Sequence, residues 1–259
     1  MTVSLEGKTF VVMGIANKRS IGWGIARSLH RAGGRLILTY NQERMERNVR
    51  ELAESLEAAW EPLILQCDVA DDDSIRQCFQ TIKEKVGVIH GLAHCIAFAK
   101  REELQGEFVN TSRDGFLLAQ DISAYSLTAV TREAKELMTE GGSIITLTYL
   151  GGERVVQNYN VMGIAKASLE ASVKYLANDL GKYNIRINAI SAGPIRTLSA
   201  KGVRDFNTVL NVIEERAPLR RTVTTEEVGD TAYFLLSDLS RGITGEIIHV
   251  DSGYHILGL

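Results

Sequence analysis

Short apolar runs alternate with helix-type patterns along almost the whole of this 259-residue chain, and this alternation limits the possible folds most strongly. Apolar and β-branched runs predict strands at 9–13, 35–40, 62–67, 91–95, 143–148, 185–191 and 246–250. Apolar residues at helical spacing predict helices at 21–32, 43–59, 71–85, 115–138 and 158–180. The strands are continuous apolar runs, as expected when a parallel sheet is covered on both faces. We therefore predict an α/β fold over residues 1–259: a single-domain, Rossmann-type doubly wound sheet of about seven parallel strands with helices on both faces.

The charge balance and the cysteines exclude several classes of protein. The formal net charge is −3 and the charges are interspersed, so neither a nucleic-acid-binding nor a membrane-binding surface is expected. Cys67, Cys78 and Cys95 lack the spacing typical of a metal site, so we expect no metal and a reducing compartment. No run approaches about 18 apolar residues, and the first residues lack the apolar core of a signal peptide. A cytoplasmic location is therefore expected.

A glycine-rich turn follows the first predicted strand and precedes the first predicted helix. Gly14, Gly22 and Gly24 mark it, with a longer spacing than the G-x-G-x-x-G of many dinucleotide-binding turns. Such a turn lets backbone amides approach a pyrophosphate at the positive end of a helix. Glycine is also common wherever a turn needs a positive φ, so the pattern is weak by itself. Its position within a βαβ unit favours dinucleotide binding.

The residues after the second and third predicted strands indicate how the adenosine half of a cofactor would be held. Asn41 and Gln42 are neutral where an acid would meet a ribose 2′-hydroxyl or a basic residue a 2′-phosphate. Glu43 would repel a phosphate, whereas Arg44 could attract one or be an ordinary solvated residue. We therefore expect NADH, with NADPH less favoured. Asp68 could accept a hydrogen bond from adenine, serve as a helix N-cap, or do both.

A tyrosine and a lysine share one face at the start of the helix predicted at 158–180. Tyr159, Met162 and Lys166 have the spacing i, i+3 and i+7, which places them in one stripe. A buried lysine near a phenol favours the phenolate and would make the tyrosine a usable acid near neutral pH. Two ordinary interfacial polar residues would give the same pattern. The dinucleotide turn elsewhere in the chain favours the catalytic interpretation.

Together these motifs resemble the short-chain dehydrogenase/reductase superfamily over about residues 5–255. The usual Tyr-x-x-x-Lys signature is altered, because Met162 stands four residues before Lys166 and Tyr149 stands where a catalytic serine is usual. With Tyr159 seven residues before Lys166, the chain is similar to the divergent branch of bacterial enoyl-acyl-carrier-protein reductases. The stretches 20–21, 149–152, 158–163 and 191–198 also match that branch.

The resemblance implies an oxidoreductase that uses NADH to reduce the double bond of trans-2-enoyl thioesters on acyl-carrier protein, the last step of each fatty-acid elongation cycle. It implies that Tyr159 hydrogen-bonds the thioester carbonyl and that Lys166 holds the nicotinamide ribose hydroxyls. The other implied cofactor contacts are Gly14, Ser20, Ile21, Asn41, Asp68, Val69, Ile96, Ile195, Arg196, Thr197, Leu198 and Ser199. The candidate substrate-binding residues are Ala99, Tyr149, Tyr159, Met162 and Phe206.

The resemblance also implies a homotetramer. The apolar tail 254–259 could pack at a subunit interface or dock on its own subunit.

The altered spacing has a physical interpretation. A phenol placed one helical turn earlier leaves more space over the cofactor, which suits a carbonyl oxygen conjugated to the reacting carbon rather than attached to it. Reduction of such a double bond leaves an enolate, whose oxyanion needs a fixed donor. Tyr149 is a further candidate catalytic residue, and it could position the substrate chain or simply pack.

Residues 197–215 are expected to form a lid over the substrate. A hinge of small residues precedes an apolar face that includes Phe206, Leu210 and Ile213. An amphipathic surface helix would show the same pattern.

Two other hypotheses are a conventional ketone or alcohol oxidoreductase of the same superfamily and a non-enzymatic dinucleotide sensor. Met162 in the usual tyrosine position argues against the first. The joint presence of Tyr159 and Lys166 argues against the second, since a sensor needs no proton donor.

Overall fold

A central sheet of seven parallel strands organises the protein, and our computed structural model describes residues 3–58, 60–197 and 206–258. The spatial order of the strands is β3-β2-β1-β4-β5-β6-β7. Their bounds are β1 (Thr9–Met13), β2 (Arg35–Tyr40), β3 (Leu63–Gln66), β4 (Gly91–His94), β5 (Gly142–Thr148), β6 (Ile185–Ala192) and β7 (Ile247–Val250). The order reverses between β1 and β4, the point where doubly wound sheets bind ligands beyond the carboxyl ends of their strands. The prediction of a Rossmann-type parallel sheet is confirmed.

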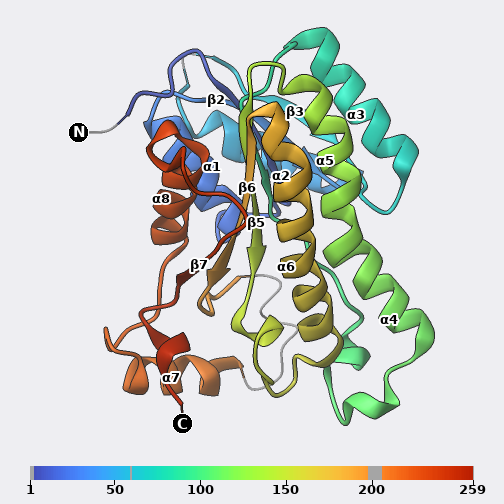
Figure 1. Cartoon of the computed structure of the whole chain (residues 1–259), viewed down its shortest axis with the longest axis vertical. Helices are drawn as coiled ribbons and strands as arrows, with labels where there is room; N and C mark the ends of the chain where they lie inside the picture. Colours follow the sequence, from blue (N-terminus) through green and yellow to red (C-terminus); the bar gives the residue numbers. More distant parts are fainter. Residues whose placement is uncertain (1–2, 59, 198–205, 259) are drawn as a thin grey trace.

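Helices cover both faces of this sheet (Figure 1), with α1 and α8 on one side and α3, α5 and α6 on the other. The longer helices are α1 (Ile21–Arg31), α2 (Glu46–Glu54), α3 (Asp72–Lys85), α4 (Arg113–Gln120), α5 (Ser126–Leu137), α6 (Asn160–Leu180), α7 (Phe206–Arg216) and α8 (Thr225–Leu236). Short turns of helix are η1 (Glu43–Met45), η2 (Arg101–Leu104), η3 (Phe108–Asn110), η4 (Asp121–Tyr125), η5 (Leu150–Gly152), η6 (Gly181–Tyr183), η8 (Asp238–Ser240) and η9 (Tyr254–Ile256).

Each face of the sheet has its own buried core. Along β1, Val11 and Met13 pack towards α3, α5 and α6, whereas Phe10 and Val12 pack towards α1, α2 and α8. Successive side chains of a strand point to opposite faces, so a strand covered on both faces must be apolar at every position. This is why the strands appear in the sequence as continuous apolar runs.

Several helix boundaries differ from the prediction. The helix expected at 115–138 is interrupted by a π-helical turn, η4, where the Ser126 hydroxyl bonds the carbonyl of Ile122 and Ser123 bonds the backbone of Phe98. The helix expected at 43–59 contains η1 and ends at Glu54, shortly before the positive φ of Glu57. Side-chain hydrogen bonds and local backbone conformation, which hydrophobic spacing does not report, set these ends.

The helix expected at 158–180 begins two residues later, at Asn160. Asn158 and Asn160 both have positive φ, so the chain enters α6 through a strained turn that leaves Tyr159 at the N-cap position. The helix α8 was not predicted at all. Its capping box, in which Thr224 and Glu227 bond each other's backbone amides, is a signal that the sequence did contain.

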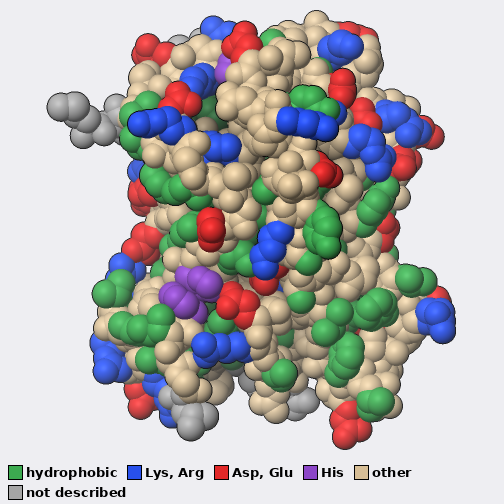
Figure 2. Space-filling model, viewed as in Figure 1, with side chains coloured by type: hydrophobic (Ala, Val, Ile, Leu, Met, Phe, Trp, Pro, Cys, Tyr) green, Lys and Arg blue, Asp and Glu red, His purple; other side chains and the backbone are tan. Residues whose placement is uncertain are grey.

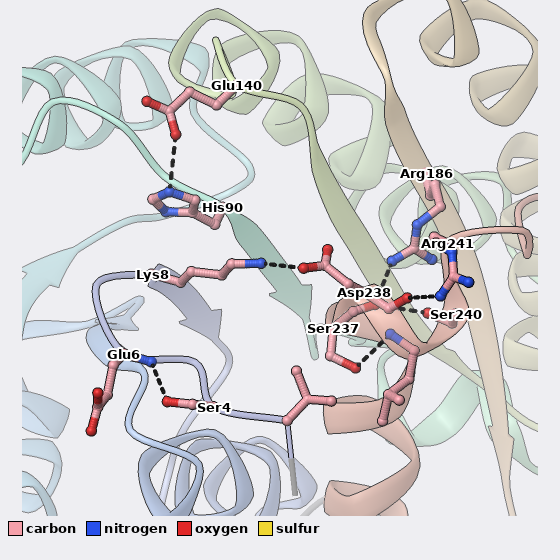
Figure 3. Close-up of polar contacts among 12 residues, drawn as sticks. Ser4, Glu6, Lys8, His90, Glu140, Arg186, Ser237, Asp238, Ser240 and Arg241 are labelled. Atoms are coloured by element: carbon pink, nitrogen blue, oxygen red, sulfur yellow. Dashed lines mark hydrogen bonds and ion pairs between the residues drawn. The ribbon is translucent and has the colours of Figure 1, made fainter.

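A polar cluster lies at the amino ends of several strands (Figure 3), whereas the switch point lies at their carboxyl ends. Arg186 donates to the carbonyl oxygens of Leu235 and Ser237, at the end of α8, and to that of Ile243. Lys8 pairs with Asp238 at 2.7 Å, next to the same helix end. Cations at the carboxyl end of a helix satisfy its last carbonyls and complement its dipole. These contacts join β6 and the N-terminal segment to α8.

In the three described stretches, no helix combines the length and apolarity that crossing a bilayer requires.

Candidate active site

Gly14 lies at the switch point, directly after β1. Its φ is +81°, and a Cβ there would lie 2.0 Å from the carbonyl oxygen of Cys95, the residue after β4. Any side chain would therefore separate the two strand ends. Ile96 contacts the same point, since its Cγ1 would lie 3.3 Å from that Cβ. The fold thus brings together two predicted cofactor residues, Gly14 and Ile96.

The Ser20 hydroxyl organises the loop between Gly14 and α1. It accepts hydrogen bonds from the amides of Ala16 and Asn17, both at 3.1 Å, and Ser20 is the N-cap residue of α1. The following residue, Ile21, begins α1 and packs on the core. The long glycine spacing is therefore a folded turn at the positive end of a helix, an arrangement that suits an anion.

Gly24 has a different role from Gly14. A Cβ on Gly24 would lie 2.2 Å from the carbonyl oxygen of Thr225, the first residue of α8. This glycine therefore permits the close packing of α1 on α8. The glycine pattern in the sequence therefore has two separate causes: Gly14 lies at the switch point, and Gly24 permits helix packing.

The predicted adenosine-binding residues lie at neighbouring strand ends. Asn41 follows β2 and is exposed, and its carbonyl oxygen accepts a hydrogen bond from Gln66 of β3 at 3.2 Å. Asp68 follows β3, and its carboxylate accepts from the amide of Ala70 at 3.1 Å. The N-cap of α3 is Asp71, so the N-cap role considered for Asp68 is wrong. The Val69 side chain is buried in the core beneath this edge.

The two tyrosines form an aromatic pair. The rings of Tyr149 and Tyr159 meet edge to face, with centroids 5.0 Å apart. Tyr159 also packs with Ala99 and Met162 in a small apolar cluster that is separate from the two cores of the sheet. Three predicted substrate-binding residues, Ala99, Tyr159 and Met162, therefore share one apolar cluster, with Tyr149 against it.

Glycines allow the turn after Tyr149 to lie directly on α6. A Cβ on Gly151 would lie 2.4 Å from the Tyr159 ring, and a Cβ on Gly163 would lie 2.7 Å from the carbonyl oxygen of Gly151. Larger residues at these positions would push the two tyrosines apart. The sequence from Tyr149 to Gly152 is thus matched in shape to the start of α6.

Lys166 is buried in α6 and reaches the end of β5. Its Nζ donates to the carbonyl oxygen of Leu147 at 2.7 Å. Burial lowers the pKa of the Lys166 ammonium to about 8, although the nearby Glu170 carboxylate favours the charged form. An ammonium has three N–H donors, so the bond to Leu147 orients the group without using its whole donor capacity.

Burial, and not Lys166, dominates the pKa of the Tyr159 phenol, which differs from the expectation that the lysine favours a phenolate. Burial raises the pKa of the Tyr159 phenol well above its usual range, and the neighbouring Tyr149 and Glu170 raise it further. Burial also raises the pKa of Tyr149 to about 12. The ammonium of Lys166 is directed to a backbone carbonyl, while the phenol lies in an apolar cluster. Both phenols therefore stay protonated and can donate a hydrogen bond.

The segment after β6 carries the remaining predicted residues. Ile195 packs on the core beside α1 and α8, and Arg196 donates to the Asn207 side chain at 3.0 Å. Thr197 donates its amide to the Ile195 carbonyl. Leu198, Ser199 and the whole predicted hinge, residues 199–202, lie outside the described residues. Phe206 is the first residue of α7, and its side chain also lies outside the described part.

Two buried polar residues at the site were missed by the sequence analysis. His94, the last residue of β4, lies between Thr146 at 3.1 Å and Ser126 at 2.9 Å, and burial lowers its pKa to about 3. Glu170 lies one helical turn after Lys166 and accepts from the Thr148 hydroxyl. The sequence did contain a signal for Glu170. It is a charged residue four positions after a candidate catalytic lysine, within an otherwise apolar stripe of the helix.

The chain is similar in sequence to one described protein family and to named proteins. The sequence pattern of the family described as Enoyl-(Acyl carrier protein) reductase matches residues 14–255. A Bacillus cereus protein named enoyl-acyl-carrier-protein reductase (NADH) FabI is 76% identical over 98% of this chain and 99% of its own length. A Staphylococcus aureus protein named as the NADPH form of the same reductase is 61% identical over 98% of this chain and 99% of its own length.

The agreement extends to three dimensions. The crystal structure of a Bacillus cereus enoyl-acyl carrier protein reductase with NADP+ and indole naphthyridinone superposes with a TM-score of 0.98. Its sequence is 75% identical, and the match covers 100% of both chains.

Proposed function

This chain belongs to the enoyl-acyl-carrier-protein reductase family, and from that premise we propose how its residues carry out the reaction. The protein is an oxidoreductase that reduces the carbon–carbon double bond of enoyl chains carried by acyl-carrier protein, the last step of fatty-acid elongation. In our proposal Tyr159 donates a hydrogen bond to the thioester carbonyl oxygen, and Lys166 holds the nicotinamide ribose hydroxyls.

The residues at the switch point suit a dinucleotide. Gly14 leaves its backbone uncovered at the strand ends, and the loop organised by Ser20 presents the positive end of α1. When bound, the nicotinamide would supply the hydride to the β-carbon of the enoyl chain. The other cofactor contacts that we propose are Ile21, Asn41, Asp68, Val69, Ile96, Ile195, Arg196, Thr197, Leu198 and Ser199.

The observation that carries the proposal is the surrounding of Tyr159, whose ring contacts that of Tyr149 and packs against the apolar cluster that includes Met162. An apolar surrounding excludes water, which strengthens a hydrogen bond to a developing oxyanion. The raised pKa of Tyr159 keeps the phenol protonated, as a hydrogen-bond donor must be. Tyr149 packs on the Tyr159 ring, and we propose that it also contacts the acyl chain.

NADH is the cofactor that we propose. Asn41 and Gln42 place no cation directly after β2, and Arg44 is exposed in η1. The named relatives include both NADH and NADPH enzymes, so the choice rests on this turn. We also propose a cytoplasmic enzyme with a lid formed by residues 197–215, in which Phe206 contacts the acyl chain.

The test is oxidation of NADH, followed at its absorbance band, with crotonyl and longer enoyl thioesters beside a panel of ketones. We expect turnover of the enoyl thioesters only. Tyr159→Phe should lower kcat by about 100-fold or more, the scale of removing one oxyanion donor, with NADH affinity nearly unchanged. Near wild-type turnover by this variant, or preferential reduction of ketones, would overturn the proposal.

A further inference from the structure

Two charged side chains of α6 hold the end of β5. Lys166 donates to the carbonyl oxygen of Leu147, and one helical turn later the Glu170 carboxylate accepts from the hydroxyl of Thr148. The three side chains of Lys166, Glu170 and Thr148 are nearly withdrawn from water, with exposed fractions of 5%, 7% and 4%. The residue after Thr148 is Tyr149, so these bonds fix the chain immediately before the aromatic pair.

Glu170 also contacts the other end of the same segment. A Cβ on Gly152 would lie 2.5 Å from Glu170 Oε1, so the carboxylate lies directly against the backbone of the turn. One carboxylate thus contacts residues 148 and 152, on both sides of Tyr149. A shift of Glu170 would move the ring on which Tyr159 packs.

The charges around this pair come from several elements. Glu170 is influenced by Lys166 on its own helix, by Glu153 after η5 and by His249 on β7. Lys166 is influenced by Glu170 and by Cys95 after β4, and its charge in turn acts on His94. Burial disfavours the charged form of Lys166, and among these groups the Glu170 carboxylate favours that form most strongly. Burial raises the pKa of the Glu170 carboxyl, and so does Glu153, whereas the Thr148 hydroxyl, Lys166 and His249 favour its ionised form.

The surface side of this cluster is also ordered. Glu153 Oε1 lies 2.7 Å from Nε2 of His249, and the His249 ring stacks on His255 with centroids 3.9 Å apart. Figure 2 shows histidine side chains gathered on this surface next to an acidic side chain. Arg154 donates to the carbonyl oxygen of Leu257, so this part of the C-terminal tail docks on its own subunit. These contacts link the turn that carries Glu153 to β7 and to the C-terminal tail.

We propose that Glu170 is a positioning residue for the reductase reaction: its carboxylate fixes the segment that carries Tyr149 and places a negative charge one helical turn from Lys166. The inference rests on the proposed roles of Tyr159 and Lys166. Glu170 does not contact the reacting atoms in this scheme. It acts through Thr148 and Gly152 on the aromatic pair, and through its charge on the ribose-holding lysine.

The test compares the pH profile of kcat/KM for Glu170→Gln with that of the wild type. Glutamine keeps an acceptor for the Thr148 hydroxyl but removes the negative charge. The variant removes the negative charge that favours the charged form of Lys166. The alkaline limb of the kcat/KM profile should therefore move to lower pH by about half a pH unit or more, which is a roughly threefold loss of kcat/KM at a fixed pH on that limb. Asp179→Asn, which removes an exposed charge from the same helix, is the matched control and should leave the profile unchanged.

Thr148→Val provides a second, independent variant. It keeps the Glu170 charge but removes the hydroxyl that favours ionisation, so the limb should move in the same direction by a smaller amount. An unshifted limb in both Glu170→Gln and Thr148→Val overturns the inference, even when activity falls, because a purely structural role lowers activity without changing the titration.

The pH dependence of NADH affinity, measured by fluorescence titration, gives the same comparison without turnover. If wild-type protein reduces no enoyl thioester, the proposed function fails, and this titration still decides whether Glu170 supports the charge on Lys166. If the wild type is active, and Glu170→Gln shows the wild-type pH dependence of both kcat/KM and NADH affinity, the proposed function stands and the inference about Glu170 fails.

Discussion

At the residue scale, we expect the affinity for NADH to depend on the protonation state of the Lys166 ammonium group. Burial lowers its pKa to about 8, so the group is charged at neutral pH and loses its proton as pH rises through about 8. Only the charged form has all three N–H donors for the ribose hydroxyls and the carbonyl of Leu147. NADH affinity should therefore be constant on the acid side and fall above about pH 8. Fluorescence titration across pH 6–10 checks this, and a flat profile would contradict the role given to the lysine.

Substitution of the same residue gives a separate prediction. Lys166→Ala should weaken NADH binding as well as turnover, because it removes the proposed donor to the ribose rather than the proposed donor to the substrate. Tyr159→Phe is the matched comparison, since it should lower turnover alone. The measurement is NADH affinity by fluorescence titration together with steady-state kinetics. Unaltered affinity in Lys166→Ala would show that the lysine does not hold the ribose.

At the scale of the element, the turn after β2 should decide the choice of dinucleotide. Asn41→Arg introduces a planar cation where a 2′-phosphate would lie. The ratio of kcat/KM values should move towards NADPH by about tenfold or more, equivalent to roughly 1.4 kcal/mol. Arg44→Ala is the control. If the wild type prefers NADPH and this variant abolishes the preference, Arg44 already binds the 2′-phosphate.

The end of α8 offers a stability prediction at the same scale. Arg186→Ala removes the cation that donates to the carbonyls of Leu235 and Ser237, which keep their serine donors, so the free energy of unfolding should fall by about 1.5–3 kcal/mol. Lys8→Ala breaks the partly exposed pair with Asp238 and should cost about 1 kcal/mol or less. Urea unfolding followed by fluorescence checks both variants. Equal losses of unfolding free energy would contradict the prediction that Arg186 contributes more than Lys8.

The elements also show what the sequence could predict. Strands such as β1 and β5 were found because both of their faces are buried, which leaves a continuous apolar run. The ends of α2 and the π-turn η4 were not found, because they depend on the φ of Glu57 and the hydroxyl of Ser126. Only the folded chain brings Glu170 to Thr148 and the Cys95 carbonyl to Gly14, so those contacts could not be predicted from spacing.

For the whole molecule, the apolar side chains on the outer helices point to association between subunits. Leu117 on α4 and Ile164 and Tyr175 on α6 are 58%, 42% and 78% exposed. The two helices lie in contact on one side of the sheet (Figure 1). Exposed apolar residues on neighbouring helices are common at subunit interfaces, and symmetric assembly repeats each contact. We therefore propose that α4 and α6 pair with their counterparts in the homotetramer that the resemblance implies.

Size-exclusion chromatography with light scattering should therefore give four times the 28.5 kDa chain mass. Leu117→Glu combined with Tyr175→Glu should produce smaller species, because every symmetric contact then buries uncompensated carboxylates, each costing about several kcal/mol. Val109→Glu alters an exposed apolar residue of η3, outside the helix pair, and should leave the assembly intact. A monomeric wild type would refute the tetramer. A tetramer that withstands the double substitution but dissociates with Val109→Glu would place the interface at η3 instead of at α4 and α6.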